Sequence, residues 1–287
     1  MIAVPPFFGD YQAIVDAELR RLVPDTGDRV QQSMAYTVHA PSKRIRPVLT
    51  MLSAELCAGT SARAVPAACV VELVHAASLV LDDLPSMDDA PLRRGRPTNH
   101  REFGEAVAIL AAFGLLNLAF GTLARQYEPG LASSLSSLLA ASVGIDGLIG
   151  GQAADLLATD TQISFEMLER IHRGKTGALF NASAVAGAMT AGASASQVAS
   201  LSAFAKNLGL AFQIIDDLLD VEGDPAQTGK ATREDLKKTT FVSFSGVAGA
   251  RQLAGELCET ADRALAPFGK RADRLRELSA FVAARFV

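Results

Sequence analysis

The chain has 287 residues, 49% of them apolar, and a formal net charge of −4. This charge argues against nucleic acid as the main partner, and the length allows one large domain or two ordinary ones. Abundant alanine, absent tryptophan and few β-branched runs between hairpin turns predict an all-helical protein with a large core.

The cysteines and the N-terminus fit a cytoplasmic protein. Cys57, Cys69 and Cys258 are odd in number and widely spaced, with no CxxC or zinc-like pattern, so we expect reduced thiols. The first ten residues hold neither a basic region nor a long apolar run, so no signal peptide is expected.

One segment, Ala106–Ala124, is long enough to cross a membrane, because its 19 residues carry no charge. Two glycines and an asparagine lower its hydropathy, and no aromatic belt flanks it. No second such span is clear. We therefore expect a helix buried inside a large bundle and no integral membrane segment.

A basic turn follows the first predicted helices. These helices are expected at Tyr11–Leu22, from Asp28 towards Val38, and, after the turn, at Val48–Cys57. In the turn, Lys43 and Arg46 lie three residues apart near a helix start, where side chains and free backbone N–H groups can share one anion. A solvated basic turn is the alternative, and it is favoured when this turn is taken alone.

The next helix, predicted to begin at Pro66, ends in a dense acidic cluster. Four carboxylates lie within eight residues: Asp82, Asp83, Asp88 and Asp89. Like charges repel by about 1 kcal/mol at 4 Å even in water, so an apolar helix that ends this way favours a bound cation. Hard oxygen ligands suit Mg²⁺, which usually keeps several waters and bridges to phosphates.

Cationic side chains flank this cluster. Arg93, Arg94 and Arg96 follow it closely, and guanidinium groups match phosphate oxygens. His75 shares a helix face with Asp82, seven residues later, which leaves a structural and a functional role equally open. The pattern predicts a site for Mg²⁺ and a diphosphate.

The middle third is predicted to be helical, at Ala106–Gln126, at Leu131–Leu157 and from Phe165 onward. Gln152 and Asp155 share one face of an apolar helix, where a hydrogen bond between helices and a shell of metal-bound water are equally open. The basic, hydroxylated segment around Lys175 and Thr176 resembles part of a phosphate loop but lacks the GxxxxGK[ST] spacing.

A second acidic cluster ends another apolar helix, predicted to start near Val198. It comprises Asp216, Asp217 and Asp220, with Gln213 one turn before Asp217. Like charges at i and i+4 destabilise a helix unless something binds them. The cluster therefore indicates a second cation-binding surface.

The segment after Asp220 is rich in turn-forming and polar residues, which predicts a mobile flap whose Lys230 can reach a phosphate. Helices from Val247 onward are expected to be packing elements. The repeated order of apolar helix, acidic cluster and basic loop predicts two halves facing each other across a cavity. An apolar interior with a charged mouth suits a ligand with a diphosphate head and a hydrocarbon tail.

These motifs together resemble those of trans-isoprenyl diphosphate synthases, and most of all bacterial geranylgeranyl diphosphate synthases of carotenoid pathways. The matching motifs are Lys43-Arg44-Ile45-Arg46-Pro47, Asp82-Asp83-x4-Asp88 with Arg93-Arg94-Gly95, Gly151-Gln152-x2-Asp155, Lys175-Thr176, and Phe212-Gln213-x2-Asp216-Asp217-x2-Asp220. The resemblance spans nearly the whole chain. It implies one polyprenyl synthetase domain over residues 1–287, an all-α bundle around a central cavity, and a homodimer.

The resemblance also implies roles for the site residues. Three Mg²⁺ ions would be held by Asp82, Asp88 and Asp216, with Asp83, Asp217 and Asp220 in or near the shell. These six aspartates and Lys175 would carry catalysis. The allylic diphosphate would be bound by Arg93, Lys175, Thr176, Gln213 and Lys230. Isopentenyl diphosphate would be bound by Lys43, Arg46, His75 and Arg94.

The implied reaction condenses isopentenyl diphosphate with dimethylallyl, geranyl or farnesyl diphosphate and releases diphosphate. One helical turn is about 5.4 Å, close to one isoprene unit, so residues below Asp82 would set the product length. Ala77 and Ser78, five and four residues before Asp82, are small where farnesyl-making relatives often have an aromatic residue. All-trans geranylgeranyl diphosphate, C20, is therefore the expected product.

Other functions remain open at this point. The same chemistry could give C15, or C25 and longer products, and a class I terpene cyclase or a non-catalytic synthase subunit is a further alternative. Two positions depart from the family pattern: Ser42 stands where glycine is usual, and Leu81 where many relatives have histidine. Neither departure removes a ligand, so activity is expected.

Overall fold

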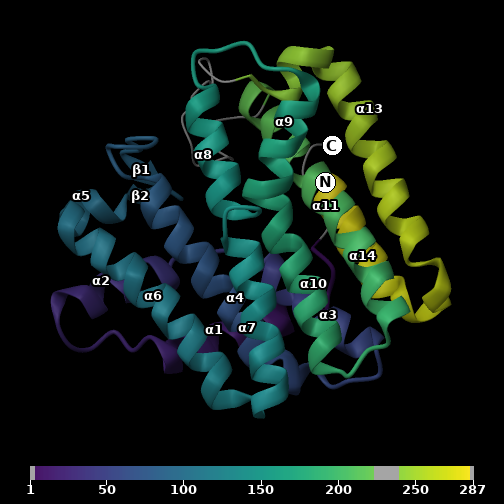
Figure 1. Ribbon diagram of the computed structural model, residues 1–287, viewed down its shortest axis with the longest axis horizontal. Helices are drawn as coiled ribbons and strands as arrows, with labels where there is room; N and C mark the ends of the chain where they lie inside the picture. Colours follow the sequence, from purple (N-terminus) through teal and green to yellow (C-terminus); the bar gives the residue numbers. More distant parts are fainter. Residues whose placement is uncertain (1–3, 223–238, 285–287) are drawn as a thin grey trace.

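The computed structural model describes residues 4–222 and 239–284, which form a bundle of helices (Figure 1). Within these ranges the regular strands are limited to a small hairpin, β1 (Leu92–Arg93) and β2 (Arg96–Pro97). The all-α expectation is therefore confirmed.

The first half of the chain supplies seven helices in the described residues. They are α1 (Phe8–Leu22), α2 (Arg29–Val38), α3 (Ile45–Leu56), α4 (Ser61–Asp82), α5 (Asn99–Phe103), α6 (Glu105–Gln126) and α7 (Pro129–Val143). The second half begins with α8 (Leu148–Ala158), α9 (Phe165–His172), a π-helical turn η1 (Arg173–Gly177) and α10 (Ala178–Thr190). It continues with α11 (Ala195–Glu222), α13 (Phe241–Ala264), a 3₁₀ segment η2 (Ala266–Ala272) and α14 (Asp273–Ala283).

Helix α10 lies at the centre of the bundle, in contact with α3, α4, α7 and α11. Ten of its thirteen residues are buried, as expected for a helix that is apolar on all sides. The packing against α3 is close, because a Cβ at Gly187 would overlap the backbone carbonyl of Thr50. Figure 1 shows α13 and α14 on one side of this centre and α2, α5 and α6 on the other.

Helices α4 and α11 deliver the two acidic clusters from this core. Helix α4 packs on α3, α6 and α10, and α11 packs on α10 and α13. Both also approach the π turn that precedes α10: α11 contacts η1 directly, and the charge of Lys175 in η1 acts on Asp82 at the end of α4. The fold therefore brings both clusters to the same turn.

Some helix boundaries differ from the sequence-based expectation. Helix α4 begins at Ser61, so Pro66 is its sixth residue and not its first, and the helix forgoes one backbone hydrogen bond there. The helix predicted at Leu131–Leu157 is divided into α7 and α8 at residues 144–147. Helix α13 starts at Phe241, six residues before the expected Val247.

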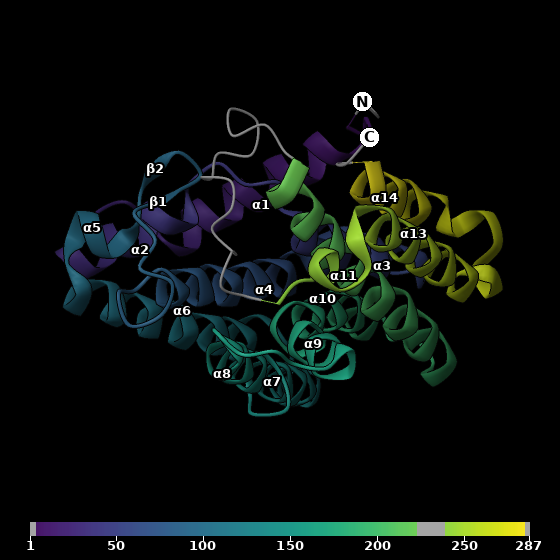
Figure 2. The same ribbon diagram turned by 90° about the horizontal axis from the view of Figure 1, so that it is seen from above.

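The structure contains more helical stretches of membrane-spanning length than the single segment expected from the sequence. Four stretches are long and apolar enough by length and composition to cross a membrane: α4, α6, residues Pro129–Ala158, and α11. Burial differs among them, from 67% of the apolar window in α4 to 39% in α6 and 28% in Pro129–Ala158. Packing against neighbours thus buries most of the apolar window of α4, whereas much of the apolar surface of α6, α7 and α8 stays exposed. These three helices lie along one side of the molecule in Figure 2.

Candidate active site

The first acidic cluster is formed where α4 ends. The backbone N–H of Asp88 donates to the carbonyl of Asp82 at 3.0 Å, which folds the loop back onto the helix end. Burial raises the pKa of Asp82 to about 6, and repulsion from Asp88 and Asp83 adds to this, against the positive charges of Lys175 and Arg93. The Asp82 and Asp88 carboxylates therefore share one electrostatic environment, as predicted for residues that hold a cation together.

Asp83 has a different partner from its neighbour Asp82. It is 2% exposed and binds Arg93, whose Nε lies 2.8 and 2.9 Å from the two carboxylate oxygens and whose Nη2 lies 2.6 Å from Oδ1. The family resemblance implies that Asp83 lies near the metal shell and that Arg93 binds the allylic diphosphate. The structure joins the two as a charge-assisted pair, so Asp83 orients Arg93.

The hairpin between β1 and β2 positions Arg94. Arg93 pairs with Arg96 across the strands, and the two turn residues between them, Arg94 (φ +54°) and Gly95 (φ +74°), are left-handed, as in a type I′ turn. The hairpin is anchored on α2, where the hydroxyl of Tyr36 donates to the Pro97 carbonyl at 2.9 Å. The predicted basic loop is thus a defined turn.

The residues predicted to bind isopentenyl diphosphate form a cationic cluster beside α4. Nη1 of Arg46 lies 3.3 Å from Nε2 of His75, and the Arg46 guanidinium lies 4.8 Å from the centre of the Phe180 ring. The pKa of His75 is well below its ordinary value. Burial is the largest cause, and four guanidinium groups add to it: Arg46, Arg94, Arg93 and Arg44. A neutral imidazole among cations is suited to an anionic ligand.

Lys43, the fourth predicted member of this cluster, is exposed in the turn just before α3. Arg46 lies in the first turn of the same helix. The structure therefore brings Arg46, His75 and Arg94 into one electrostatic neighbourhood, and it places Lys43 on the turn that carries Arg46.

The π turn η1 presents Lys175 and Thr176. Nζ of Lys175 lies 2.8 Å from Oδ2 of Asp155 on α8, so Asp155 forms an ion pair between helical segments. The segments touch closely, because a Cβ at Gly151 would overlap the backbone of Gly174 and Lys175. Gln152 is 7% exposed and makes a weak contact with the Met87 sulfur at 3.8 Å. π turns of this kind are frequent at functional sites.

The second acidic cluster is tied to the π turn by a chain of hydrogen bonds. Thr176 Oγ1 donates to Gln213 Oε1 at 2.9 Å, and Gln213 Nε2 donates to Asp217 Oδ1 at 3.1 Å. The other Asp217 oxygen accepts from the backbone N–H of Phe241, the first residue of α13, at 3.0 Å. Asp217 is 4% exposed and so caps α13, whereas Asp216 and Asp220 are only partly buried.

Lys230 lies outside the described residues. Among the residues that the structure describes, no group of three or more His, Cys, Asp or Glu side chains could hold a metal ion. Carboxylates therefore come to the site in smaller groups, around Asp82 and around Asp216.

The contacts that were missed from the sequence include the capping role of Asp217 and the ion pairs of Arg44 with Glu72 and Asp16. Glu72 carried a usable signal, because an acid in the middle of the apolar helix α4 requires a buried partner. The capping role had none, since Asp217 and Phe241 lie far apart in the chain.

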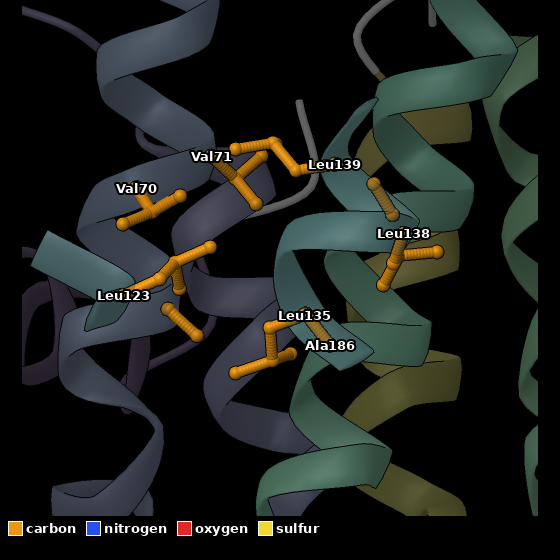
Figure 3. A pocket seen from close by; sticks show the side chains of 9 residues that line it. Val70, Val71, Leu123, Leu135, Leu138, Leu139 and Ala186 are labelled. Atoms are coloured by element: carbon orange, nitrogen blue, oxygen red, sulfur yellow. The ribbon is translucent and has the colours of Figure 1, made fainter. Parts of the chain in front are cut away.

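An apolar cavity lies further down α4 (Figure 3). It is lined by Ala67, Val70 and Val71 of α4, Leu123 of α6, Leu135, Leu138 and Leu139 of α7, and Ala182 and Ala186 of α10. Ala67, Val71, Ser78 and Asp82 share one face of α4 by helical spacing. The cavity therefore lies below the first acidic cluster on the face that carries Ser78, while Ala77 is 1% exposed in the core.

Comparisons with known proteins match this arrangement. Residues 28–260 match the family model described as polyprenyl synthetase. The chain is 39% identical to the farnesyl diphosphate synthase of Geobacillus stearothermophilus over 272 residues, which cover 92% of each protein. It is also 39% identical to the geranylgeranyl diphosphate synthase of Cyanophora paradoxa over 279 residues, which cover 95% of this chain and 93% of the relative.

A solved structure gives the same picture. The crystal structure of an FPP/GFPP synthase from Zymomonas mobilis has a TM-score of 0.87 and 32% identity, covering 97% of this chain and 98% of that one. The names of these proteins differ in product, so the similarity identifies a chemistry and not a chain length.

Proposed function

The chain belongs to the polyprenyl synthetase family, and from this premise we propose that it elongates an allylic diphosphate with isopentenyl diphosphate to give geranylgeranyl diphosphate. Prenyl transfer follows from the family; the C20 product and the need for Mg²⁺ are the proposal. The observation that carries it is the presence of two groups of anion-binding side chains near α4. Arg46, His75 and Arg94 form one, and Lys175 with Thr176 belongs to the other.

The donor set fits Mg²⁺. The ion is usually bound through one or two carboxylates together with substrate phosphates and water, and not in a cage made by protein alone. Asp82 and Asp88 from one cluster and Asp216 from the other match this pattern. Burial, with repulsion from Asp88 and Asp83, raises the pKa of Asp82, and a bound cation would offset this cost of charging the carboxylate. We propose that these residues hold Mg²⁺, three ions per site. When bound, the metal would neutralise charge that builds up on the departing diphosphate.

The protein's own side chains support the same step. The allylic carbon–oxygen bond breaks with its electron pair moving to the diphosphate, where the charges of Lys175 and Arg93 stabilise it. The double bond of isopentenyl diphosphate then attacks the allylic cation, and the proton lost from the adduct passes to the released diphosphate. Arg46, Arg94 and neutral His75 hold the second diphosphate in place without a side-chain nucleophile.

The position of the cavity along α4, rather than its small volume of about 10 Å³, supports a C20 product. Val71 and Ala67 lie 11 and 15 residues before Asp82, which is about 16 to 22 Å along a helix. Since one turn is close to one isoprene unit, this depth corresponds to roughly three to four units. Ser78, a small residue, lies between this cavity and Asp82 along α4, and Leu135 and Leu139 line the cavity itself.

The test is incubation with Mg²⁺, isopentenyl diphosphate and each allylic primer in turn, followed by product chromatography. We expect elongation that requires Mg²⁺ and ends at C20. No elongation by the intact chain would overturn the proposal as a whole. Elongation that ends at C15, or that continues to C25, would overturn the product assignment alone.

Graded variants test the depth argument. Ser78→Phe, one turn below Asp82, should shorten the product more than Val71→Phe, three turns below, and Ala77→Tyr should also shorten it. Ile14→Phe, at a half-exposed position on α1, is the matched control and should leave C20 unchanged. If Ser78→Phe and Val71→Phe still make C20, the tunnel does not run along this face of α4.

We further propose that the protein is a homodimer that buries the exposed apolar side chains of α6 and α8. They are Ile109, Leu110 and Phe113 on α6, Ile149 and Leu157 on α8, and Ile145 just before α8. These helices lie along one side of the molecule in Figure 2. An exposed apolar patch of this kind typically marks an interface.

A further inference from the structure

The basic turn before α3 contains three cations, and the middle one has a different environment from the other two. Arg44 is 4% exposed, whereas Lys43 is exposed and Arg46 is partly exposed. Arg44 also has a left-handed backbone, with φ 48° and ψ 35°, at the N-cap of α3. Such a conformation is unfavourable for a residue with a Cβ and persists only where the surroundings fix it.

The Arg44 guanidinium connects three neighbouring helices. Nη1 donates to Glu72 of α4 at 2.7 Å, Nε donates to Asp16 of α1 at 2.9 Å, and Nη2 donates to the carbonyl of Val38, the last residue of α2, at 2.6 Å. Glu72 is 2% exposed. Because both carboxylates compensate the charge of Arg44, its guanidinium is engaged within the fold and is not expected to bind a diphosphate.

The backbone of the turn is held at further points. Gln12 Nε2 of α1 donates to the carbonyls of Ser42 and Lys43 at 3.2 and 3.0 Å. The backbone N–H of Arg44 donates to Ser42 Oγ at 3.3 Å, and that hydroxyl donates to Glu72 at 3.4 Å. The two carbonyls next to Lys43 and the backbone of Arg44 are therefore fixed relative to α1 and α4.

One face of α4 contacts two of the three cations in the turn, Arg44 and Arg46. Glu72 binds Arg44, and His75, one turn further along α4, lies 3.3 Å from Arg46. A shift of Arg44 would thus displace Lys43 and Arg46 relative to His75. Lys175, Thr176 and Gln213 lie on other elements, η1 and α11, where Lys175 donates to Asp155 and Thr176 donates to Gln213.

We propose that Arg44, held by Glu72 and Asp16, is a positioning residue that sets the affinity for isopentenyl diphosphate and leaves the allylic site unaffected. This inference rests on the proposed function, because it assigns Lys43, Arg46 and His75 to isopentenyl diphosphate. It predicts that a change at a buried residue without contact to either substrate alters one Michaelis constant selectively.

The test measures the two Michaelis constants separately, together with the thermal unfolding temperature. Arg44→Lys keeps the charge but cannot reach three acceptors with one planar fork. We expect the KM for isopentenyl diphosphate to rise by at least about tenfold, as for other small displacements of binding groups. The KM for the allylic substrate should stay within about twofold of the wild-type value, since its binding residues are not displaced.

Two further variants keep the proposal testable if Arg44→Lys folds poorly. The double variant Arg44→Met with Glu72→Met removes the buried pair and takes the Arg44 partner only from Asp16, which is 34% exposed; folds often tolerate replacement of a buried pair by apolar residues. Asp16→Asn removes only the partner that is 34% exposed. Both should raise the KM for isopentenyl diphosphate selectively, and Asp16→Asn should have the smaller effect.

Glu55→Gln is the matched control. Glu55 accepts from Tyr11 at 2.7 Å and from Arg274 at 3.1 Å, so it joins α1, α3 and α14 without touching the basic turn. This variant should lower stability and leave both constants unchanged. Unchanged constants in the Arg44 and Asp16 variants, or a parallel rise of both in step with lost stability, would overturn the positioning role. Failure of the proposed function would instead appear as absent elongation by the wild-type protein in the same assay.

Discussion

Two adjacent aspartates of the second acidic cluster have different surroundings. Asp217 is 4% exposed, and its two oxygens accept from Gln213 and from the backbone N–H of Phe241. Asp216 is partly exposed on the face that it shares with Asp220. Neighbours on a helix point about 100° apart, so the Asp217 carboxylate holds the fold, and we propose that the Asp216 carboxylate faces the site.

Asparagine at these two positions should therefore have opposite effects. Asp217→Asn should destabilise the protein by about 1.5 to 3 kcal/mol, because it removes a buried charged acceptor from two donors. Asp216→Asn should leave stability unchanged or raise it slightly, since it relieves repulsion with Asp220, while elongation falls sharply. Urea unfolding and turnover, measured on both variants, check this. Equal loss of stability in both would contradict the separation of roles.

His75 predicts a specific dependence of stability on pH. Its pKa in the folded protein lies well below 6.5 because of burial and the surrounding guanidinium groups. The unfolded chain then takes up the proton first as pH falls through about 6.5, so this residue makes the folded state less stable below that pH. The same stability is fully present above the unfolded pKa.

His75→Gln removes this titration while keeping a polar side chain of similar size. We expect the variant to lose less stability than the wild type between pH 7.5 and pH 5.5 in urea unfolding. Burial also lowers the pKa of His39, so His39 contributes a pH dependence of the same sign to both proteins. The difference between the two proteins therefore reports on His75 alone. A pH dependence that is identical in the variant would show that His75 does not carry the effect.

At the level of residues, spacing predicted which side chains gather but not which partner each one has. The neighbourhood of Arg46, His75 and Arg94 was expected from the resemblance, and the structure brings them together. The pairing of Asp83 with Arg93 was not foreseen, because ten residues of loop and hairpin separate them. Which oxygens face a neighbour depends on the loop geometry, and spacing alone does not give this.

The contact between α8 and η1 shows how an element positions a site residue. Gly151 allows the backbone of η1 to approach, and the approach lets Asp155 bind Lys175 at 2.8 Å. Only a residue without a side chain fits there, since a Cβ would overlap backbone atoms that cannot move aside cheaply.

Gly151→Ala should therefore separate η1 from α8. We expect a loss of about 1 to 3 kcal/mol from overpacking, and elongation should fall by more than this loss of stability explains, since Lys175 moves. Thermal unfolding and turnover check both effects. Gly130→Ala is the control, because a Cβ there meets nothing within 4 Å, and it should be neutral or stabilising. Full activity in Gly151→Ala would contradict the role given to this contact.

Most helices were predictable from periodicity, and the exceptions have local causes. The break between α7 and α8 contains Gly144 and Gly147, and a Cβ at Gly147 would overlap the carbonyl of Ser142. The apolar pattern continues on both sides of this break, so periodicity alone predicts one helix. Proline is common at the first position of a helix, so Pro66 predicts a helix start, but α4 already has a full turn before it.

At the scale of the whole molecule, η1 connects the two acidic clusters. Lys175 acts on Asp82 at the end of α4, and Thr176 donates to Gln213 on α11 at 2.9 Å. The sequence predicted two clusters facing one cavity, but the segment of η1 taken alone was only a weak signal, because it lacks the GxxxxGK[ST] spacing of nucleotide-binding loops. Its function depends on where the bundle places it, which local sequence does not encode.

The apolar side formed by α6, α7 and α8 predicts the oligomeric state. Phe113 is 66% exposed, Ile145 77% and Leu157 83%, values that are unusual for large apolar side chains on a protein surface. A stable protein interface buries roughly 1,200 to 2,000 Å² in total, and a second copy of this chain can present the same helices. We therefore expect a dimer in size-exclusion chromatography with light scattering.

Phe113→Glu should shift this dimer towards monomer, because a carboxylate at the interface core would lose its water without gaining a partner. Ile14→Glu is the control. Ile14 is 44% exposed on α1, on the opposite side of the molecule from α6 to α8 in Figure 2, so the dimer should persist. A wild-type monomer, or equal behaviour of the two variants, would contradict the interface. Because α6, which lies in the interface, also carries Leu123 of the apolar cavity, loss of the dimer should loosen the cavity and broaden the product lengths.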